Sequence, residues 1–313
     1  MLGEFELIRR YFTPSALPAQ VITGVGDDCA VLRLPPGCDM AISVDTQVCG
    51  VHFPAEADAA SLASRVLRCA ASDLAAMGAE PLGFTLALTL PQADEQWLQA
   101  FASGLQQAAA DLRCPLVGGD TTKGPLTLSV QVHGSVPAGA ALLRSGAQPG
   151  DEVWVSGTLG DGAAALALLQ GRLAVDAAAG AYLHSRFYQP AIDFPLALAL
   201  RGMAHSCIDV SDGLLADLGH ICHASGVAAR IRQADLPLSA HWRAAAGDTQ
   251  ALQWALAGGD DYRLCFTAAP QHHAALQALG ASCIGDISAG SGIVVVDARG
   301  VPCEITATGF RHF

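Results

Sequence analysis

Lysine is almost absent from this chain of 313 residues, because Lys123 is the only one. A P-loop needs a lysine followed by serine or threonine at the end of a glycine-rich loop, but Lys123 is followed by Gly124 and Pro125. A protein-kinase fold needs a strand lysine together with His-Arg-Asp and Asp-Phe-Gly motifs, and neither motif is present. A phosphate site in this chain must therefore use carboxylate-bound metal, arginine and backbone N–H groups.

Other catalytic signatures are missing as well. The sequence has no Gly-x-Ser-x-Gly, His-Glu-x-x-His or Gly-x-Gly-x-x-Gly motif. Its 10 cysteines form no Cys-x-x-Cys pair, which favours single buried thiols over disulfides or a metal cage. Glutamate is also scarce, since 22 of the 29 acidic residues are aspartate. Because glutamate is the better helix former, this bias indicates that aspartate serves local purposes.

Basic residues are too few for a nucleic-acid partner. The net charge is −12, with a pI near 5.1, and nothing here could neutralise a run of phosphates. The longest uncharged stretches, 124–143 and 264–285, are broken by Gly, Pro and polar residues, so we expect no membrane span. The acidic start, with Glu4 and Glu6, lacks the positive region of a signal peptide, and we expect a cytoplasmic protein.

Strand and helix patterns alternate along the whole chain, which predicts a mixed α/β (α+β) fold in two domains. We place the domains at 1–137 and 151–313, joined by a Pro/Gly-rich linker at 138–150. The expected strands are 39–45, 83–90, 126–136, 151–156, 206–210, 227–232, 262–267, 282–287 and 292–297. The expected helices are 59–77, 94–112, 161–170, 176–186, 193–204, 212–224 and 270–279.

Three aspartates fall where strands are expected to end. Asp45 and Asp209 each close an apolar strand, and Asp120 follows Pro-Leu-Val-Gly-Gly. Carboxylates at the carboxyl ends of strands suit a crevice site in an α/β sheet. Asp73 lies in an apolar helix, where an unpaired carboxylate is costly. Clustered oxygen ligands without a Cys or His pattern point to Mg²⁺, although turn or cap roles are the alternative for Asp28, Asp73, Asp212 and Asp217.

Glycines and one arginine fit phosphate binding. Gly118 and Gly119 allow close approach of an anion, and the segment 157–162 opens a helix whose N-terminus suits phosphate, although it equally suits an ordinary turn. Arg144 is the only charged residue in the segment 124–150, and its planar guanidinium suits two-pronged binding of a phosphate. His52 suits either a buried position in the core or a position in the binding site.

Eight sequence blocks occur in the order found in one family. They are Gly3-Glu4-Phe5, Gly26-Asp27-Asp28-Cys29-Ala30, Asp45-Thr46 with Gly50-Val51-His52-Phe53, residues 72–79, Gly118-Gly119-Asp120-Thr121-Thr122, Arg144-Ser145-Gly146-Ala147, residues 208–214, and Gly258-Gly259-Asp260-Asp261-Tyr262, and the end 309–313 matches too. With them the whole chain resembles the thiamine-monophosphate kinases of the aminoimidazole-ribonucleotide-synthetase-like superfamily.

The resemblance implies ATP-dependent phosphorylation of thiamine monophosphate to thiamine diphosphate with several Mg²⁺ ions. It also implies a homodimer that pairs through its N-terminal sheets, with each active site in a cleft between the two domains. The implied metal ligands are Asp28, Ser43, Asp45, Asp73, Asp120, Asp209 and Asp212, of which Asp45, Asp73, Asp120 and Asp209 carry the catalysis. The implied ATP contacts are Gly119, Asp120, Arg144 and Ser211, and the implied thiamine-phosphate contacts are His52, Asp260 and Phe310.

Four positions depart from the family pattern. They are Val44 in place of a common Thr, Lys123 in place of Arg, Asp260 in place of Glu, and Phe310 in place of Tyr or Trp. These departures affect how the substrate is held rather than the reaction class. Two alternatives stay open: another ATP-using member of the superfamily, and a non-catalytic binder of nucleotide or thiamine diphosphate. Against two such members, the chain lacks the reactive N-terminal cysteine of a selenophosphate synthetase and the C-terminal cysteine of the hydrogenase-maturation relative.

Overall fold

The computed structural model describes residues 3–14 and 16–303. Within them the chain divides into two compact units. The first unit holds the residues up to Leu74 together with Ala79–Gly139, and the second holds Ala75–Gly78 together with the residues from Ala140 onward.

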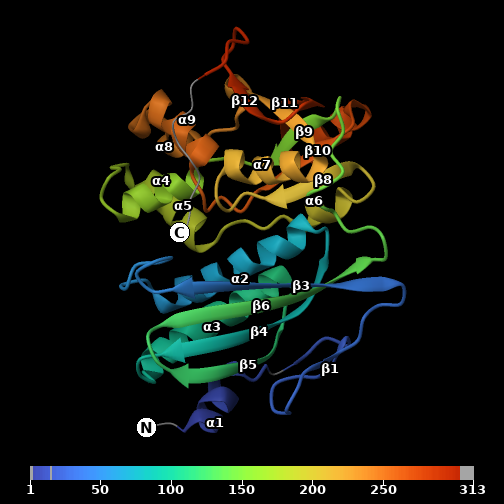
Figure 1. The fold of residues 1–313 in the computed structure, drawn as a ribbon. Helices are drawn as coiled ribbons and strands as arrows, with labels where there is room; N and C mark the ends of the chain where they lie inside the picture. Colours follow the sequence, from blue (N-terminus) through green and yellow to red (C-terminus); the bar gives the residue numbers. More distant parts are fainter. Residues whose placement is uncertain (1–2, 15, 304–313) are drawn as a thin grey trace. The chain divides into compact units, whose positions relative to one another are not determined.

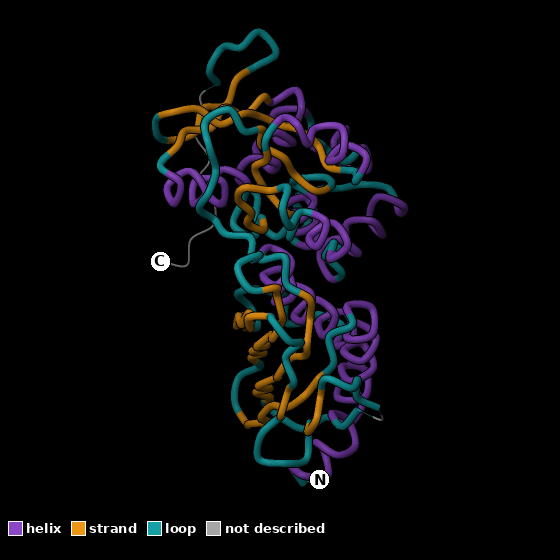
Figure 2. The backbone as a smooth tube through the Cα atoms, turned by 90° about the vertical axis from the view of Figure 1, so that its right-hand side faces the viewer, coloured by secondary structure: helices purple, strands orange, loops and turns teal. Residues whose placement is uncertain are grey.

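The first unit is a four-stranded sheet with two long helices on one face (Figures 1 and 2). The strand order is β3 (Cys38–Val48), β6 (Thr127–Pro137), β4 (Glu80–Leu90) and β5 (Leu116–Lys123). Only β4 and β5 run parallel. The helices are α2 (Ala59–Ala76) and α3 (Glu95–Leu112), and Figure 2 shows them on the same side of the strands. The other described elements of this unit are α1 (Glu4–Leu7), the π-helical turn η1 (Ile8–Phe12), β1 (Val21–Thr23) and β2 (Val31–Leu32).

Local sequence explains why α3 forms where it does. Asp94 caps its first turn by accepting a hydrogen bond from the Trp97 N–H at 2.8 Å, an interaction that typically stabilises a helix by about 1 kcal/mol. Leu98, Phe101 and Leu105 follow at helical spacing and are all buried. The helix expected at 94–112 is thus confirmed, with Asp94 as its N-cap.

The second unit is built on a six-stranded mixed sheet (Figure 1). The strand order is β12 (Gly292–Val296), β9 (Val227–Arg232), β11 (Ala281–Ala289), β7 (Glu152–Ser156), β10 (Leu264–Ala268) and β8 (Ala204–Asp209). The helices are α4 (Asp161–Leu169), α5 (Ala177–Tyr188), α6 (Phe194–Ala199), α7 (Leu214–Ser225), α8 (Ala240–Ala246), α9 (Asp248–Ala257) and α10 (His273–Ala278), with short 3-10 turns η2 (Gln233–Asp235) and η3 (Pro270–His272). The mixed α/β class expected from the sequence is confirmed.

Several expected elements need correction. The strand expected at 39–45 runs on to Val48. For the strand β5, formed by residues 116–123, only an end at Asp120 was expected, and the strand runs on to Lys123. Helices α8 and α9 were also missed, and the helix expected at 193–204 ends at Ala199. All ten cysteines are free, as expected. Among the described residues, no helix combines the length and apolar character needed to cross a membrane.

Candidate functional site

Three oxygen-bearing side chains meet between β3 and α2 in the first unit. The hydroxyl of Ser43 donates to Oδ2 of Asp73 at 2.5 Å. Asp45 lies two residues after Ser43 on the same strand, and alternate strand residues share a face. The structure therefore brings Ser43, Asp45 and Asp73 together on the helix-covered face of the sheet.

The two carboxylates of this cluster disfavour each other's charge. Burial raises the pKa of Asp45, and the nearby charge of Asp73 raises it further. A hydrogen bond with Gln47 and the positive charges of His52 and Arg65 act in the opposite direction but do not cancel the rise. A divalent cation would stabilise both carboxylates in their ionised forms.

This cluster suits Mg²⁺ by its chemistry. All three side chains offer hard oxygen ligands, which Mg²⁺ prefers over nitrogen or sulfur. Asp73 is only half-buried, so an ion and its water molecules can reach it. The residues therefore fit the metal that the sequence implies.

His52 lies in the loop that follows β3. Its Nδ1 accepts a hydrogen bond from the Val48 N–H at 3.0 Å, so the ring carries a proton on Nε2 when it is neutral. The ring is half-buried, and its charged form lowers the pKa of Asp45. The structure thus places His52 near the cluster.

Asp120 lies apart from the cluster in this unit. Asp45 pairs with Val130 across the sheet. Val130 pairs with Leu86, and Leu86 pairs with Gly119. Because Asp120 follows Gly119 in β5, its side chain points to the opposite face from that of Asp45. Three strand spacings of about 4.8 Å put the two strands about 14 Å apart.

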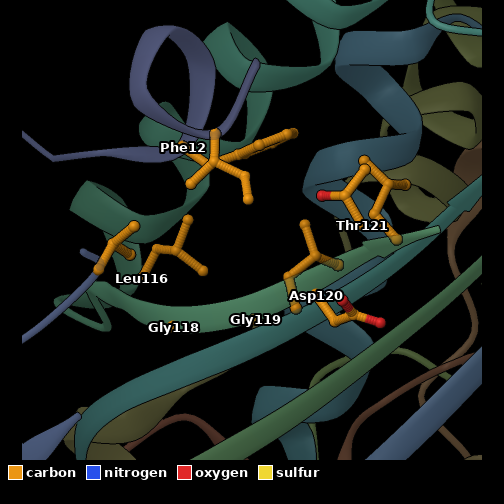
Figure 3. A pocket seen from close by; sticks show the side chains of 10 residues that line it. Phe12, Leu116, Gly118, Gly119, Asp120 and Thr121 are labelled. Carbon is orange, nitrogen blue, oxygen red and sulfur yellow. The ribbon is translucent and has the colours of Figure 1, made fainter. Parts of the chain in front are cut away.

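The backbone around Asp120 borders an apolar pocket (Figure 3). Thr121 points into the pocket, while the Asp120 carboxylate lies on the other side of the strand. Gly119 is required by packing, since a Cβ there would collide with the carbonyl oxygen of Leu86. The pocket is lined by Ile8, Phe12, Val25, Leu86, Leu88, Leu116 and residues 118–121.

The expected positions of two aspartates at strand ends are wrong. Asp45 lies inside β3 and Asp120 lies inside β5, whereas Asp209 is indeed the last residue of β8. The strands continue past Asp45 and Asp120 because residues of high β-propensity follow each of them. Asp28, another expected ligand, is exposed in a loop, and its N–H donates to Oδ1 of Asp27 at 3.0 Å.

The second unit gathers its expected site residues around the loop between β8 and α7. Asp209 is buried at the end of β8, and Ser211 and Asp212 follow it half-buried. Oδ2 of Asp217 accepts hydrogen bonds at 3.1 Å from the N–H groups of Ser211, Asp212 and Gly213. Burial raises the pKa of Asp217 to about 7, and the charge of Asp209 contributes to the rise. Asp217 therefore shapes the loop that presents Asp209 and Asp212.

A second loop, between α9 and β10, joins this group. The Asp260 N–H donates to the carbonyl oxygen of Ser211 at 2.9 Å, so the two loops are tied together. Asp260 has a left-handed backbone with φ of 66°, and its Oδ1 accepts a hydrogen bond from the Tyr262 hydroxyl at 3.0 Å. The structure thus brings Asp209, Ser211, Asp212 and Asp260 into one region of the unit.

A buried network supports this second loop. Asp261 accepts hydrogen bonds from the N–H groups of Gly160 at 2.6 Å and of Gly162 at 2.9 Å. These N–H groups belong to the start of α4 and already bind a carboxylate of the chain, so the ordinary turn, one of the two interpretations of 157–162, is the one that fits. The side chain of Asp161 accepts hydrogen bonds from Thr158, Tyr182, Arg186 and Trp242.

Sequence reasoning missed Asp261 and Tyr262 as supporting residues and read Asp217 as an ordinary turn or cap residue. Asp217 follows Asp212 by five residues, and its position early in a helix was a usable signal. Nothing local distinguishes Asp261 from Asp260, because the partners of Asp261 lie about a hundred residues away.

Two expected ligand-binding residues remain. Arg144 is exposed, and its carbonyl oxygen accepts a hydrogen bond from the Ser225 hydroxyl at 3.3 Å. The same hydroxyl accepts from the N–H groups of Gly146 and Ala147, which fixes the loop that carries Arg144. Phe310 lies outside the described residues.

Comparison with known proteins identifies the family of this chain. Residues 26–136 match the N-terminal domain of AIR synthase related proteins, and residues 148–298 match the C-terminal domain. The fold and the carboxylate-rich loops therefore define a protein of the AIR synthase related class. Thiamine-monophosphate kinase of Salmonella typhimurium is 47% identical over 319 residues, covering 99% of this chain and 98% of that protein. The chain belongs to the thiamine-monophosphate kinase family.

Solved structures lead to the same family. The crystal structure of thiamine-monophosphate kinase from Stenotrophomonas maltophilia matches at 45% identity with a TM-score of 0.83, covering 88% of this chain and 91% of that one. AaThiL complexed with AMPPCP and TMP matches at 29% identity with a TM-score of 0.81, covering 89% of each chain.

Proposed function

We propose that this protein transfers a phosphoryl group from ATP to thiamine monophosphate, giving thiamine diphosphate and ADP. The observation that carries the proposal is the 47% identity to thiamine-monophosphate kinase over 99% of the chain. A relative of the same fold binds AMPPCP and TMP together, which supports the pairing of an ATP-type donor with this acceptor.

The acceptor sets the chemical problem that the site has to solve. The phosphate of thiamine monophosphate is already an oxyanion near neutral pH, so no side chain has to remove a proton from it. The difficulty is to bring two polyanions together and align them, which in phosphoryl transfer is the work of positioning and electrostatic stabilisation. The abundance of aspartate around the loops fits a site that holds cations.

We assign the metal-holding role to oxygen ligands of both units. When bound, Mg²⁺ neutralises phosphate charge and favours an aligned transfer. Ser43, Asp45 and Asp73 form the cluster that suits one ion best, because they already lie together. The complete proposed ligand set is Asp28, Ser43, Asp45, Asp73, Asp120, Asp209 and Asp212. The carboxylates assigned to catalysis are Asp45, Asp73, Asp120 and Asp209.

The substrates are assigned to the neighbouring polar groups. We propose that ATP is held by Gly119, Asp120, Arg144 and Ser211. The exposed guanidinium of Arg144 can form two parallel hydrogen bonds with a phosphate, and its loop is fixed by Ser225. Thiamine monophosphate is assigned to His52, Asp260 and Phe310. The hydrogen bond from Tyr262 orients the Asp260 carboxylate for this role.

We also propose a homodimer that forms through the first unit. The face of β3 away from the helices exposes Met40, Ile42 and Val44, of which Val44 is 64% exposed. An exposed row of apolar side chains on an open sheet is typical of an interface. We assign the metal, ATP and dimer contacts to residues 1–137 and the second group of ligands to residues 151–313. Residues 138–150 form the linker between them. Because ATP is the co-substrate, we place the reaction in the cytoplasm.

An acceptor screen tests the assignment. Purified protein is incubated with ATP and Mg²⁺, and ADP release is followed with thiamine monophosphate, thiamine or inorganic phosphate as the acceptor. We expect ADP release with thiamine monophosphate as the acceptor and none with thiamine or inorganic phosphate. Equal release with all three, or release without any acceptor, would contradict the proposed substrate. ATP binding without turnover would point to the non-catalytic binder.

A further inference from the structure

We propose that the second unit contains a zinc-type metal site formed by Glu152, His273 and Cys283. Among the described residues, these three are the one group of three or more His, Cys, Asp or Glu side chains whose ligand atoms all lie within 4.8 Å of one another. None of them belongs to the proposed substrate or Mg²⁺ sites. The inference therefore does not depend on the proposed function.

The sheet of the second unit brings two of the ligands to one face. Cys283 in β11 pairs with Trp154 in β7, so their side chains lie on the same face. Glu152 precedes Trp154 by two residues and shares that face. His273, the first residue of α10, covers the same place, since its ring centroid lies 5.0 Å from that of Trp154. Three separate elements thus converge on one point.

The distances fit a common ion. The Nδ1 of His273 lies 2.9 Å from Oε1 and 3.0 Å from Oε2 of Glu152. Nitrogen and oxygen ligands of a tetrahedral zinc ion, each about 2.1 Å from the metal, are about 3.4 Å apart. A small opening of the pair accommodates the ion, and without it the two groups lie within hydrogen-bond distance of each other.

The mixed donor set selects the metal. A thiolate, an imidazole and a carboxylate together suit Zn²⁺ and similar borderline ions, whereas Mg²⁺ prefers oxygen alone. Three protein ligands leave a fourth position for water. The side chain of His273 is 41% exposed and that of Glu152 is 21% exposed, so an ion can enter from solvent.

Arg232 supports the sulfur ligand rather than excluding the ion. Its Nη2 lies 3.5 Å from Sγ of Cys283, close enough to donate a hydrogen bond to a thiolate. Its positive charge is offset by Asp235 at 2.5 Å and by Asp286 at 3.2 Å. On binding, the Zn–S bond forms, the S–H bond breaks and its proton passes to solvent.

Cobalt(II) serves as the spectroscopic probe, with excess Mg²⁺ present so that the oxygen-ligand site is filled. We expect one Co²⁺ per chain, a thiolate-to-cobalt charge-transfer band, and loss of that band on addition of Zn²⁺. Cys283→Ser should abolish the band, and the matched change Cys303→Ser, at another half-buried cysteine of the same unit, should retain it. No band in the unmodified protein, or a band that survives Cys283→Ser, would overturn the site.

A second pair of variants keeps the test decisive if Cys283→Ser folds poorly. His273→Asn should weaken Zn²⁺ binding at least tenfold, measured by competition with a chromogenic chelator, and Glu152→Gln should weaken it similarly. His272→Asn, at the neighbouring histidine outside the cluster, should leave it unchanged. Equal affinity in His273→Asn and His272→Asn would overturn the proposal.

Discussion

Asp261 offers a sharp test of how the second unit holds its site loop. It is 1% exposed and accepts hydrogen bonds from the N–H groups of Gly160 and Gly162. Burial raises its pKa to about 7, and the charge of Asp161 acts in the same direction. The two N–H donors and Arg186 act in the opposite direction but do not outweigh burial. Ionisation of Asp261 therefore destabilises the folded chain.

The magnitude follows from the two pKa values. A carboxyl group with a folded pKa of about 7 and an unfolded pKa of about 3.9 binds its proton more tightly in the folded chain. Its contribution to the free energy of unfolding is full below about pH 4 and is lost as the pH rises through about 7. Between pH 5 and pH 8 the loss is about 3 kcal/mol.

The variant Asp261→Asn cannot titrate at this position. Its amide keeps one oxygen acceptor but turns a donor toward one of the two glycine N–H groups, so we expect it to be destabilised at every pH. Relative to the unmodified protein, this destabilisation should be larger at pH 5 than at pH 8 by about 3 kcal/mol.

Urea unfolding at several pH values, followed by tryptophan fluorescence, measures the difference. Three of the four tryptophans, Trp154, Trp242 and Trp254, lie in the second unit and report on it. Asp248→Asn, at an exposed aspartate of the same unit, is the matched control and should show no such pH dependence. A destabilisation of Asp261→Asn that grows with pH would refute the reasoning, because it would mean that the donors outweigh burial.

Three further predictions concern the proposed site and interface. Asp73→Asn should abolish turnover while circular dichroism shows an intact fold, and near-normal activity would remove Asp73 from the metal ligands. Tyr262→Phe deletes the hydrogen bond to Asp260, which is worth about 1 kcal/mol. The KM for thiamine monophosphate should therefore rise about fivefold, while the KM for ATP stays unchanged. Equal changes in both KM values would contradict a role for Asp260 in binding the acceptor. Ile42→Glu on the open sheet face should produce monomers in sedimentation experiments, whereas the control Val31→Glu, at another exposed apolar residue, should not.

Regular periodicity made much of the fold predictable. The strand expected at 83–90 and the helix expected at 94–112 appear as β4 and α3. The extent of β5 was missed because Gly118 and Gly119 weaken the strand pattern, and of the two only Gly119 is required by packing against β4. α8 and α9 were missed because their short runs are alanine-rich and carry few buried positions.

The site was predictable by residue type more than by arrangement. An aspartate in an apolar helix predicted that Asp73 needs a partner, and the Ser43 hydroxyl bonds to it. The separation of Asp45 and Asp120 onto opposite faces depends on strand register over three pairings, which no local pattern contains. The support of the Asp260 loop by Asp261 likewise depends on contacts between distant segments.

The central claim is phosphoryl transfer from ATP to thiamine monophosphate, and phosphorus NMR of the reaction mixture tests it most directly. With ATP and Mg²⁺ present, we predict that the thiamine monophosphate signal is replaced by the two coupled signals of thiamine diphosphate as ADP accumulates, and that a chelator stops the reaction. ADP and inorganic phosphate without thiamine diphosphate, or no change at all, would contradict the claim.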